Sequence, residues 1–298
     1  MIYDVRHVTT VDYAAPVHLA RFNLRLKPAV WPGQTLHSYA LTIDPLPWTV
    51  HEQAGPWVVN RSRLLIRTPL RHLSIESRFR MEVAYPSFDL NVACGPHNAP
   101  TIAQVRERAA THRDLSAMGP ASYLYPSPMA PASTDIAAWA ARFFGPGENV
   151  VMAGRALMGA IFGEFTYDGS ATTAETPPEQ AFAARHGVCQ DFAHVMIVAA
   201  RAHGIPAAYI SGYLRTLPPP GKPRLIGADA THAWAALWCG DEWGWVGFDP
   251  TNDTFTRTDH IFTAMGRDYS DVSPMDGVFR GGGGQMMRVS VDVAPVED

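Results

Sequence analysis

Cysteine is scarce in this chain of 298 residues, which has only three: Cys94, Cys189 and Cys239. Because that number is odd and no two cysteines are spaced as a CxxC pair, the sequence excludes a disulfide framework. Long apolar runs are also missing. The richest, 192–200, is far shorter than the roughly 18 residues that a membrane-spanning helix needs. The question is therefore what a single thiol could do in a globular protein.

Strong net charge is absent as well. The formal net charge is −4, which gives no general attraction to phosphate backbones or anionic lipids. We therefore expect neither nucleic acid nor a membrane as a partner. Residues 1–6 show no positively charged leader followed by an apolar run, which predicts no secretory signal and a cytoplasmic location. Hydrophobic residues make up 47% of the chain and charged residues 17%, as is typical of a folded protein.

The first part of the chain alternates apolar and polar residues with a period of two. In the longest such run, Phe79, Met81 and Val83 are separated by charged side chains. This pattern indicates strands with one face buried and the other in water. Turn signals separate these runs at intervals that suit an antiparallel sheet pair. We predict an N-terminal β-sandwich over 1–95.

The composition then changes twice. Proline, alanine and serine dominate 96–132, which we interpret as a linker with one short helix. From 133 onward the apolar period is first that of helices and then that of strands, so we predict an α+β core over 133–298 with a last alternating strand near the C-terminus. The expected helices are 133–145, 150–165, 176–187 and 189–202, and the main expected strands are 207–214, 231–238 and 245–249.

Cys189 stands at the start of the most apolar of these helices. A thiol in that position lies near the positive end of the helix dipole and near unpaired backbone N–H groups, both of which favour the thiolate. A free cysteine is more often a small buried residue, and that interpretation suits Cys94 and Cys239. Cys189 differs from them because of the residues that follow it.

His232 and Asp249 lie on two strands that a short turn joins. In an antiparallel pair, residues equidistant from the turn face each other with Cβ atoms about 4.5 to 5.5 Å apart. With a turn centred between 240 and 241, His232 and Asp249 become neighbours, with the register uncertain by one or two residues. An aspartate on one imidazole nitrogen leaves the other free to take a proton from a thiol. Taken singly, a strand histidine is more often a core residue and an aspartate before proline a turn residue, but the conjunction with Cys189 is much more specific.

Several segments closely resemble the bacterial transglutaminase-like family, and the similarity extends over nearly the whole chain. That superfamily has a papain-like core and includes transglutaminases, peptide N-glycanases and cysteine proteases. The first 90 or so residues look like the β-sandwich domain that precedes this core. The segments that carry the resemblance are Gly187-Val188-Cys189-Gln190-Asp191-Phe192-Ala193-His194, Gly204-Ile205-Pro206-Ala207-Ala208-Tyr209-Ile210-Ser211-Gly212-Tyr213, His232-Ala233-Trp234 and Phe248-Asp249-Pro250-Thr251-Asn252.

The resemblance implies a Cys189 nucleophile, a His232 general base and acid, and an orienting Asp249. The expected chemistry is acyl transfer through a thioester. The backbone N–H of Cys189 is one expected oxyanion donor. Tyr167 is a candidate for the second by position, although packing on the core is the more common role of such an aromatic residue. Trp234 shares a strand face with His232 and is a candidate for the wall of a substrate groove.

We expect no metal and no cofactor. His186, His194 and His203 together with Cys189 have a spacing that matches no known ligand set, and no calcium-binding loop pattern is present. Asp191 is expected to act as a structural acceptor near the helix N-terminus.

Three functions stay open from the sequence. Hydrolysis of a peptide, protein or small amide is the main prediction, because water is always available as an acceptor. Transfer to an amine, as in a protein-glutamine transglutaminase, uses the same three residues. A non-catalytic peptide-binding module that keeps the fold belongs to a different class. The reactivity of Cys189 toward iodoacetamide separates that class from the two enzymatic ones.

Overall fold

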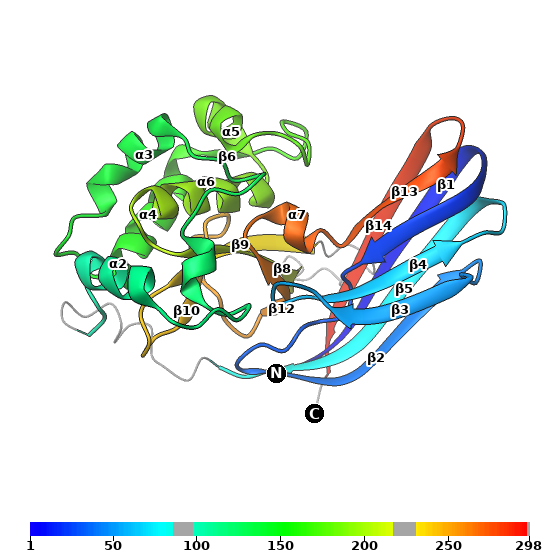
Figure 1. Cartoon of the computed structure of the whole chain (residues 1–298), viewed down its shortest axis with the longest axis horizontal. Helices are drawn as coiled ribbons and strands as arrows, with labels where there is room; N and C mark the ends of the chain where they lie inside the picture. Colours follow the sequence, from blue (N-terminus) through cyan, green and yellow to red (C-terminus); the bar gives the residue numbers. More distant parts are fainter. Residues whose placement is uncertain (86–97, 217–230, 297–298) are drawn as a thin grey trace, which may run out of the picture.

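The computed structural model describes residues 1–85, 98–216 and 231–296, and Cys94 lies outside them. Two regions are visible in Figure 1: a long antiparallel sheet at one side and a mixed helical and strand region at the other. Among the described residues, no helix is both long and apolar enough to cross a membrane. The α+β fold class predicted from the sequence is confirmed.

The N-terminal region is one curled antiparallel sheet of seven strands. Its path runs β2-β5-β1-β4-β3, with β13 and β14 also pairing with β1. The first half of β1 lies between β5 and β14, and its second half lies between β4 and β13, so β1 connects the two halves of the sheet. The strands are β1 (Ile2–Leu24), β2 (Gln34–Asp44), β3 (Thr49–Ala54), β4 (Asn60–Ile66), β5 (Leu70–Val83), β13 (Met275–Gly281) and β14 (Gln285–Pro295).

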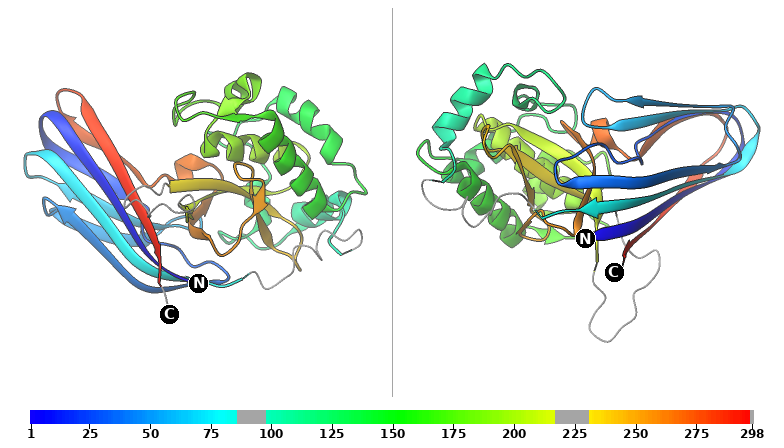
Figure 2. Two further views of the ribbon diagram at one scale, coloured as in Figure 1. Left: turned by 180° about the vertical axis from the view of Figure 1, so that it is seen from behind. Right: turned by 90° about the horizontal axis from the view of Figure 1, so that it is seen from below.

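The C-terminal strands differ from the sequence-based division of the chain. We placed the last alternating strand in the 133–298 core, but β13 and β14 return to the N-terminal sheet, as Figure 2 shows where red strands run beside the blue one. The physical reason is that β1 needs partners on both edges to satisfy its backbone groups. Alternation predicts a strand and its buried face, but it does not identify the partner strand.

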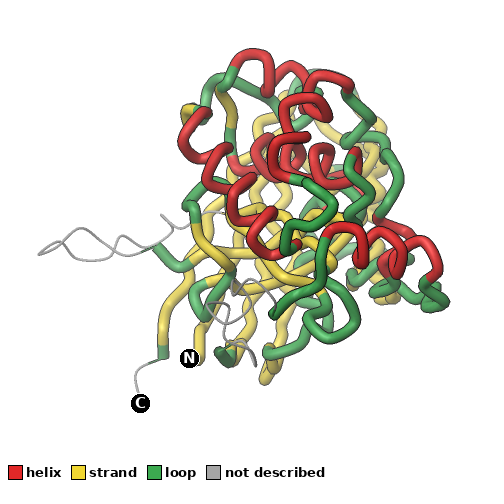
Figure 3. The backbone as a smooth tube through the Cα atoms, turned by 90° about the vertical axis from the view of Figure 1, so that its left-hand side faces the viewer, coloured by secondary structure: helices red, strands yellow, loops and turns green. Residues whose placement is uncertain are grey.

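The core consists of a second antiparallel sheet with helices packed on one of its faces. The sheet has the order β11-β10-β9-β8-β12, and a short parallel pair, β6 with β7, lies apart from it. Viewed from the core side, the helices lie in front and above, with strands behind and below (Figure 3). These strands are β6 (Thr166–Tyr167), β7 (His186–Gly187), β8 (Ala207–Leu214), β9 (Thr231–Trp238), β10 (Trp245–Asp249), β11 (Thr254–Phe255) and β12 (His260–Gly266).

The helices match most of the predicted ones. The long helix predicted over 189–202 is α6 (Cys189–Ala202), and it is buried from Asp191 to Arg201 against β9 and the neighbouring helices. The other helical segments are α2 (Ile102–Thr111), η1 (Pro120–Tyr123), α3 (Thr134–Ala140), η2 (Ala141–Phe143), α4 (Val150–Glu164), α5 (Pro178–Ala184) and α7 (Tyr269–Val272).

Two boundaries are shifted from their predicted places. Helix α5 ends at Ala184 rather than at Gly187, and its C-cap residue Arg185 adopts a left-handed conformation with φ 57°. The Arg185 guanidinium packs over the Phe182 ring at 4.2 Å, a cation–π contact that offsets part of the backbone strain. The described part of the predicted linker is not a free connection either, because Ile102 and Val105 of α2 are fully buried in the core.

The two regions are joined by an apolar cluster and by buried polar contacts. Tyr3, Val5 and Phe79 of the N-terminal sheet pack with Tyr213 of β8 and Ile261 of β12. The contact lies at the end of the core sheet where β12 begins and pairs with the end of β8.

Candidate active site

Cys189 is the first residue of α6 and is half-buried. The residue before it, Val188, is the N-cap and makes no side-chain hydrogen bond to the helix. The first-turn N–H groups, including that of Cys189, therefore lack the usual capping partner and point toward the thiol end of the helix. This arrangement can stabilise a negative charge on the sulfur or on a nearby oxygen.

Asp191 fixes the chain just before the thiol. Its Oδ2 accepts hydrogen bonds from the Val188 N–H at 2.8 Å and from Thr172 Oγ1 at 2.7 Å, as expected of an acceptor near the helix N-terminus. Burial raises the pKa of Asp191, opposed by these two hydrogen bonds. Gly187 is required here, because a Cβ at that position would lie 2.7 Å from Asp191 Oδ2. Together these contacts orient the turn that presents Cys189.

The hairpin brings His232 and Asp249 together, although in a different register from the predicted one. Trp245 pairs with Trp238, so His232 lies two residues before the position opposite Asp249. The turn is wider than expected, with Gly240 and Gly244 both at positive φ (95° and 59°). His232 Nε2 still donates to Asp249 Oδ2 at 2.8 Å, because diagonal neighbours on one strand face are within reach of long side chains.

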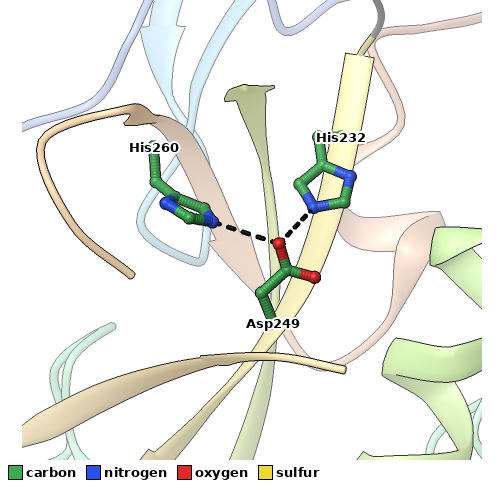
Figure 4. A group of neighbouring side chains, drawn as sticks. All are labelled: His232, Asp249 and His260. Atoms are coloured by element: carbon green, nitrogen blue, oxygen red, sulfur yellow. Dashed lines mark hydrogen bonds and ion pairs between the residues drawn. The ribbon is translucent and has the colours of Figure 1, made fainter. Parts of the chain in front are cut away.

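Asp249 is fully buried and is surrounded by donors (Figure 4). Its Oδ2 accepts from His232 Nε2 at 2.8 Å, His260 Nε2 at 3.1 Å and Asn252 Nδ2 at 2.7 Å. Its Oδ1 accepts from the Thr251 N–H at 3.0 Å. Burial alone would raise the pKa of this carboxyl, but the hydrogen bonds from His232 and His260 lower it below its usual range. Asp249 is therefore a carboxylate at neutral pH.

His232 interacts with the thiol as well as with the carboxylate. Burial by itself lowers the pKa of His232, but hydrogen bonds with Asp249 and Cys189 and their charges raise it to about 10. Because Nε2 is bonded to Asp249, Nδ1 is the nitrogen left for Cys189. The imidazole thus interacts with both a thiol and a carboxylate, the combination that a thiolate–imidazolium pair needs.

Tyr167 lies beside the segment that leads to the nucleophile. In the parallel pair, Tyr167 of β6 faces Gly187 of β7, and its ring packs edge-on to Phe192 at 6.4 Å between centroids. Its side chain is 59% exposed, so it is not packed into the core. Burial and the Cys189 charge raise the pKa of the Tyr167 hydroxyl, which keeps it a donor at neutral pH.

Trp234 lies deeper than Tyr167. It is 3% exposed, and its ring contacts those of His232 and His260 at centroid distances of 6.0 Å and 5.3 Å. It also lines a cavity of about 530 Å³ between the N-terminal sheet and the core sheet. Trp31 and His260 form part of the same wall. Trp234 therefore supports the two histidines from the cavity side.

His232, Asp249 and His260 together could be considered as metal ligands, since one donor atom from each lies within 4.8 Å of the others. Their contacts fit a hydrogen-bonded network better. Asp249 Oδ2 already accepts three N–H groups, two of them from these histidines. A metal ion would need both histidine N–H groups to lose their proton at Nε2 and turn that atom to the ion. These distances therefore describe a hydrogen-bonded network rather than a metal-binding site.

Three neighbours of this site were not singled out from the sequence. His260 and Asn252 hydrogen-bond to Asp249, and Tyr209 is close enough for the Cys189 charge to contribute, after burial, to its raised pKa. Asn252 and Tyr209 lie within the quoted family segments, so their positions carried a signal. His260 lies outside these segments. His194 does not join the site, because its Nε2 accepts the Tyr269 N–H at 3.2 Å deep in the core.

Known protein families match both regions of the chain. The Transglutaminase-like superfamily core matches residues 137–250, and the Bacterial transglutaminase-like N-terminal region matches residues 3–82. The first match includes Cys189, His232 and Asp249, and the second covers most of the N-terminal sheet strands that precede the core.

Individual relatives match either nearly the whole chain or part of it. Uncharacterized proteins of Mycobacterium tuberculosis and Mycobacterium bovis are 36% identical over 303 residues, which is 99% of this chain and 93% of theirs. A protein-glutamine gamma-glutamyltransferase of Pseudomonas aeruginosa is 34% identical over 105 residues, covering 33% of this chain and 16% of that one. Among solved structures, a candidate cysteine protease from Cytophaga hutchinsonii superposes with a TM-score of 0.75 at 20% identity, covering 100% of this chain and 92% of that one, which establishes a shared fold.

Proposed function

This chain belongs to the bacterial transglutaminase-like family, and on that premise we propose that it is a cysteine-dependent enzyme that hydrolyses peptide or other amide bonds. The observation that carries the proposal is the contact chain from the Cys189 thiol through His232 to the Asp249 carboxylate. A buried carboxylate held by four donors is costly to build, and such clusters concentrate at functional sites.

The first half of the proposed reaction forms an acyl-enzyme. His232 takes the thiol proton of Cys189, and the sulfur attacks the carbonyl carbon of the amide. The carbonyl π electrons move to oxygen and give a tetrahedral oxyanion. When the oxyanion collapses, the C–N bond breaks, and the leaving amine takes the proton from His232.

The second half releases the acyl group. A water molecule gives a proton to His232 as its oxygen attacks the thioester carbon. Collapse of the second tetrahedral species breaks the C–S bond, and the proton returns to sulfur. The products are a carboxylic acid and the free thiol, so no other reactant is needed. Asp249 stabilises the imidazolium in both halves without itself accepting the proton.

The oxyanion has one donor supplied by the helix start and one candidate from a side chain. The N–H of Cys189 belongs to the uncapped first turn of α6. The Tyr167 hydroxyl is the second candidate, since its side chain is exposed beside the thiol. Removal of one such donor typically costs about 10² to 10³ in kcat.

The acceptor is the least constrained part of the proposal. A relative that matches part of the core is named a protein-glutamine gamma-glutamyltransferase, so an amine replacing water is the alternative outcome. The substrate class is a peptide, a protein or a small amide, and the cytoplasm is the predicted compartment. The prediction that nucleic acid and membranes are not partners rests on the modest net charge of −4.

The test is a comparison of wild type with Cys189→Ala on a peptide library, with and without a primary amine, read by mass spectrometry. We expect new carboxyl termini from wild type and none from the variant. Cys239→Ala is the matched control, because that thiol is fully buried at the end of β9 and burial raises its pKa. Amine adducts without cleavage would favour transfer, while unchanged peptides in every arm would leave the binding module as the function.

A further inference from the structure

His260 is the second histidine on Asp249, and the reaction as derived does not use it. It is the first residue of β12 and is 5% exposed. Its Nε2 lies 3.1 Å from Asp249 Oδ2, on another side of the carboxylate from His232, as Figure 4 shows. The two imidazole centroids are 6.2 Å apart, so each reaches the carboxylate without touching the other.

The hydrogen bonds of His260 indicate which ring nitrogen donates to Asp249 and which accepts. Its Nδ1 accepts the Arg257 N–H at 3.3 Å, so that nitrogen carries no proton. The proton is then on Nε2, where it is donated to Asp249. An imidazole that accepts a hydrogen bond at Nδ1 and donates one at Nε2 is held in one orientation and is a directional donor to the carboxylate.

The N-terminal sheet holds the residues on either side of His260. Asp259 accepts the Tyr3 hydroxyl of β1 at 3.0 Å and pairs with Arg215 at 2.8 Å. Ile261 is fully buried in the cluster that includes Tyr3 and other residues of the N-terminal sheet. The backbone position of His260 is therefore set by contacts that span the two regions.

His260 also separates Asp249 from open space. It lines the cavity of about 530 Å³ whose wall includes Trp31 and Val83 of the N-terminal region and Trp234 of the core. Without the imidazole, the cavity would extend to the carboxylate. Water there would compete with His232 for Oδ2, and the carboxylate would be free to rotate.

We propose that His260 is a positioning residue through which the N-terminal sheet holds the Asp249 carboxylate against His232. This inference rests on the proposed function, because it assigns to His260 the task of keeping a catalytic carboxylate aligned. It also gives the N-terminal sheet a role, which is to buttress the site from behind β12.

The test uses the rate of Cys189 alkylation by iodoacetamide between pH 5 and 9 in the full chain, with the modified peptide quantified by mass spectrometry. This readout reports the thiolate–imidazolium pair and needs no substrate. For His260→Leu we expect the rate at pH 6 to fall about tenfold, since a hydrogen bond to a charged group is lost. The rate should then rise with pH as that of an ordinary thiol does.

Three further variants separate positioning from a general loss of structure. His260→Gln keeps an N–H donor near the Nε2 position, and we expect its alkylation profile to stay within about threefold of wild type. His203→Leu removes another partly buried histidine, which contacts the Ala137 carbonyl at 2.9 Å, and should leave the profile unchanged. Tyr3→Phe should lower the rate at pH 6 by about twofold, with no further loss when it is combined with His260→Leu.

The outcomes distinguish this inference from the proposed function. If His260→Leu reacts at pH 6 as fast as wild type, the positioning role of His260 is overturned, but the proposed enzymatic function is not. An equal loss in His203→Leu also overturns it, because the effect would then be general. If wild-type Cys189 itself reacts as an ordinary thiol at every pH, the proposed function falls, and the inference falls with it. Should His260→Leu not fold, His260→Asn, whose amide is too short to reach Asp249, takes its place with the same expectations.

Discussion

The two sheets of this protein hold their charged groups in opposite ways. On the N-terminal sheet, Arg80 and Asp4 form a two-pronged pair at 2.8 Å and 2.7 Å, with side chains 47% and 52% exposed. On the core sheet, Asp249 is fully buried and its histidine partners are 9% and 5% exposed. Exposed pairs contribute little to stability, whereas a buried charge costs several kcal/mol unless it is fully hydrogen-bonded. Fold stability alone therefore gives no reason for the buried cluster.

Two buried histidines sharpen the same contrast. His7 of β1 is 1% exposed and bonds only to the hydroxyl groups of Tyr213 and Thr9, at 2.9 Å and 3.0 Å. Burial lowers the pKa of His7 to about 4, so it is neutral at pH 7. His232 is also buried, but its carboxylate and thiol partners raise its pKa. The difference between the two imidazoles comes from the charge of their partners rather than from burial.

Removal of the Asp249 charge should have the largest effect, because it removes the difference between His232 and His7. In Asp249→Asn we expect kcat/KM for amide hydrolysis to fall on the order of 10⁴-fold, because an orienting carboxylate contributes that much in triads of this kind. The asparagine amide would be a weaker hydrogen-bond partner for His232 and would carry no negative charge. His232 would then resemble His7, whose partners are neutral hydroxyl groups. The measurement is the rate of peptide cleavage on the substrate identified with wild type.

The control for that loss is a variant that removes a donor from the same carboxylate and keeps its charge. Asn252→Ala takes away the Nδ2 bond at 2.7 Å but leaves both histidines in place. Its rate should fall much less than that of Asp249→Asn. Equal losses in the two variants would mean that the charge of Asp249 is not what matters.

The contribution of the Asp249–His232 pair to the free energy of unfolding should depend on pH. The pKa of Asp249 is lowered in the fold, so its contribution is present above the unfolded pKa of about 4 and is lost as the pH falls through the folded value. The pKa of His232 is raised, so its contribution is complete below about pH 6.5 and declines as the pH rises through the folded value. The pair therefore contributes most between about pH 4 and pH 6.5.

Urea unfolding of wild type and Asp249→Asn across this range measures that contribution. We expect the free energy of unfolding to differ by about 3 kcal/mol near pH 5.5, as for other broken buried pairs. The difference should shrink toward pH 3 and toward pH 10. A difference that stays constant with pH would show that packing, and not ionisation, accounts for the destabilisation.

Much of the core could be predicted because its signals are local. The bounds of β8, β9 and β10 are those predicted from alternation, and α6 starts and ends where Cys189 and the Gly204-Ile205-Pro206 stop place it. The neighbourhood of Cys189, His232 and Asp249 followed from a helix start and a hairpin. The error of register arose because the alternation does not reveal how many residues the turn between Gly240 and Gly244 takes up.

What the sequence could not predict depends on pairing between distant segments. His260 reaches Asp249 although β9 and β8 lie between β10 and β12 in the sheet, a proximity that no local pattern specifies. The return of β14 to β1 joins residues nearly the whole chain apart, such as Tyr3 and Pro295. The first contact lies within the core and the second within the N-terminal sheet. The proposed buttressing depends on both and on the bond between Tyr3 and Asp259, so it became visible only in three dimensions.

The smallest effect is expected where the N-terminal sheet carries its charges in water. For Arg80→Ala we expect the free energy of unfolding to fall by about 0.5 to 1 kcal/mol, because an exposed pair gains little over solvation. The difference in unfolding free energy between wild type and Arg80→Ala should be smaller in 1 M salt, where exposed charges are screened within about 3 Å. Urea unfolding at the two salt concentrations measures it, and Cys189 alkylation should be unchanged, since the Arg80–Asp4 pair is exposed on neighbouring strands of the N-terminal sheet. A loss of several kcal/mol would contradict the comparison between the two sheets, because the exposed pair would then contribute as much to stability as the buried cluster does.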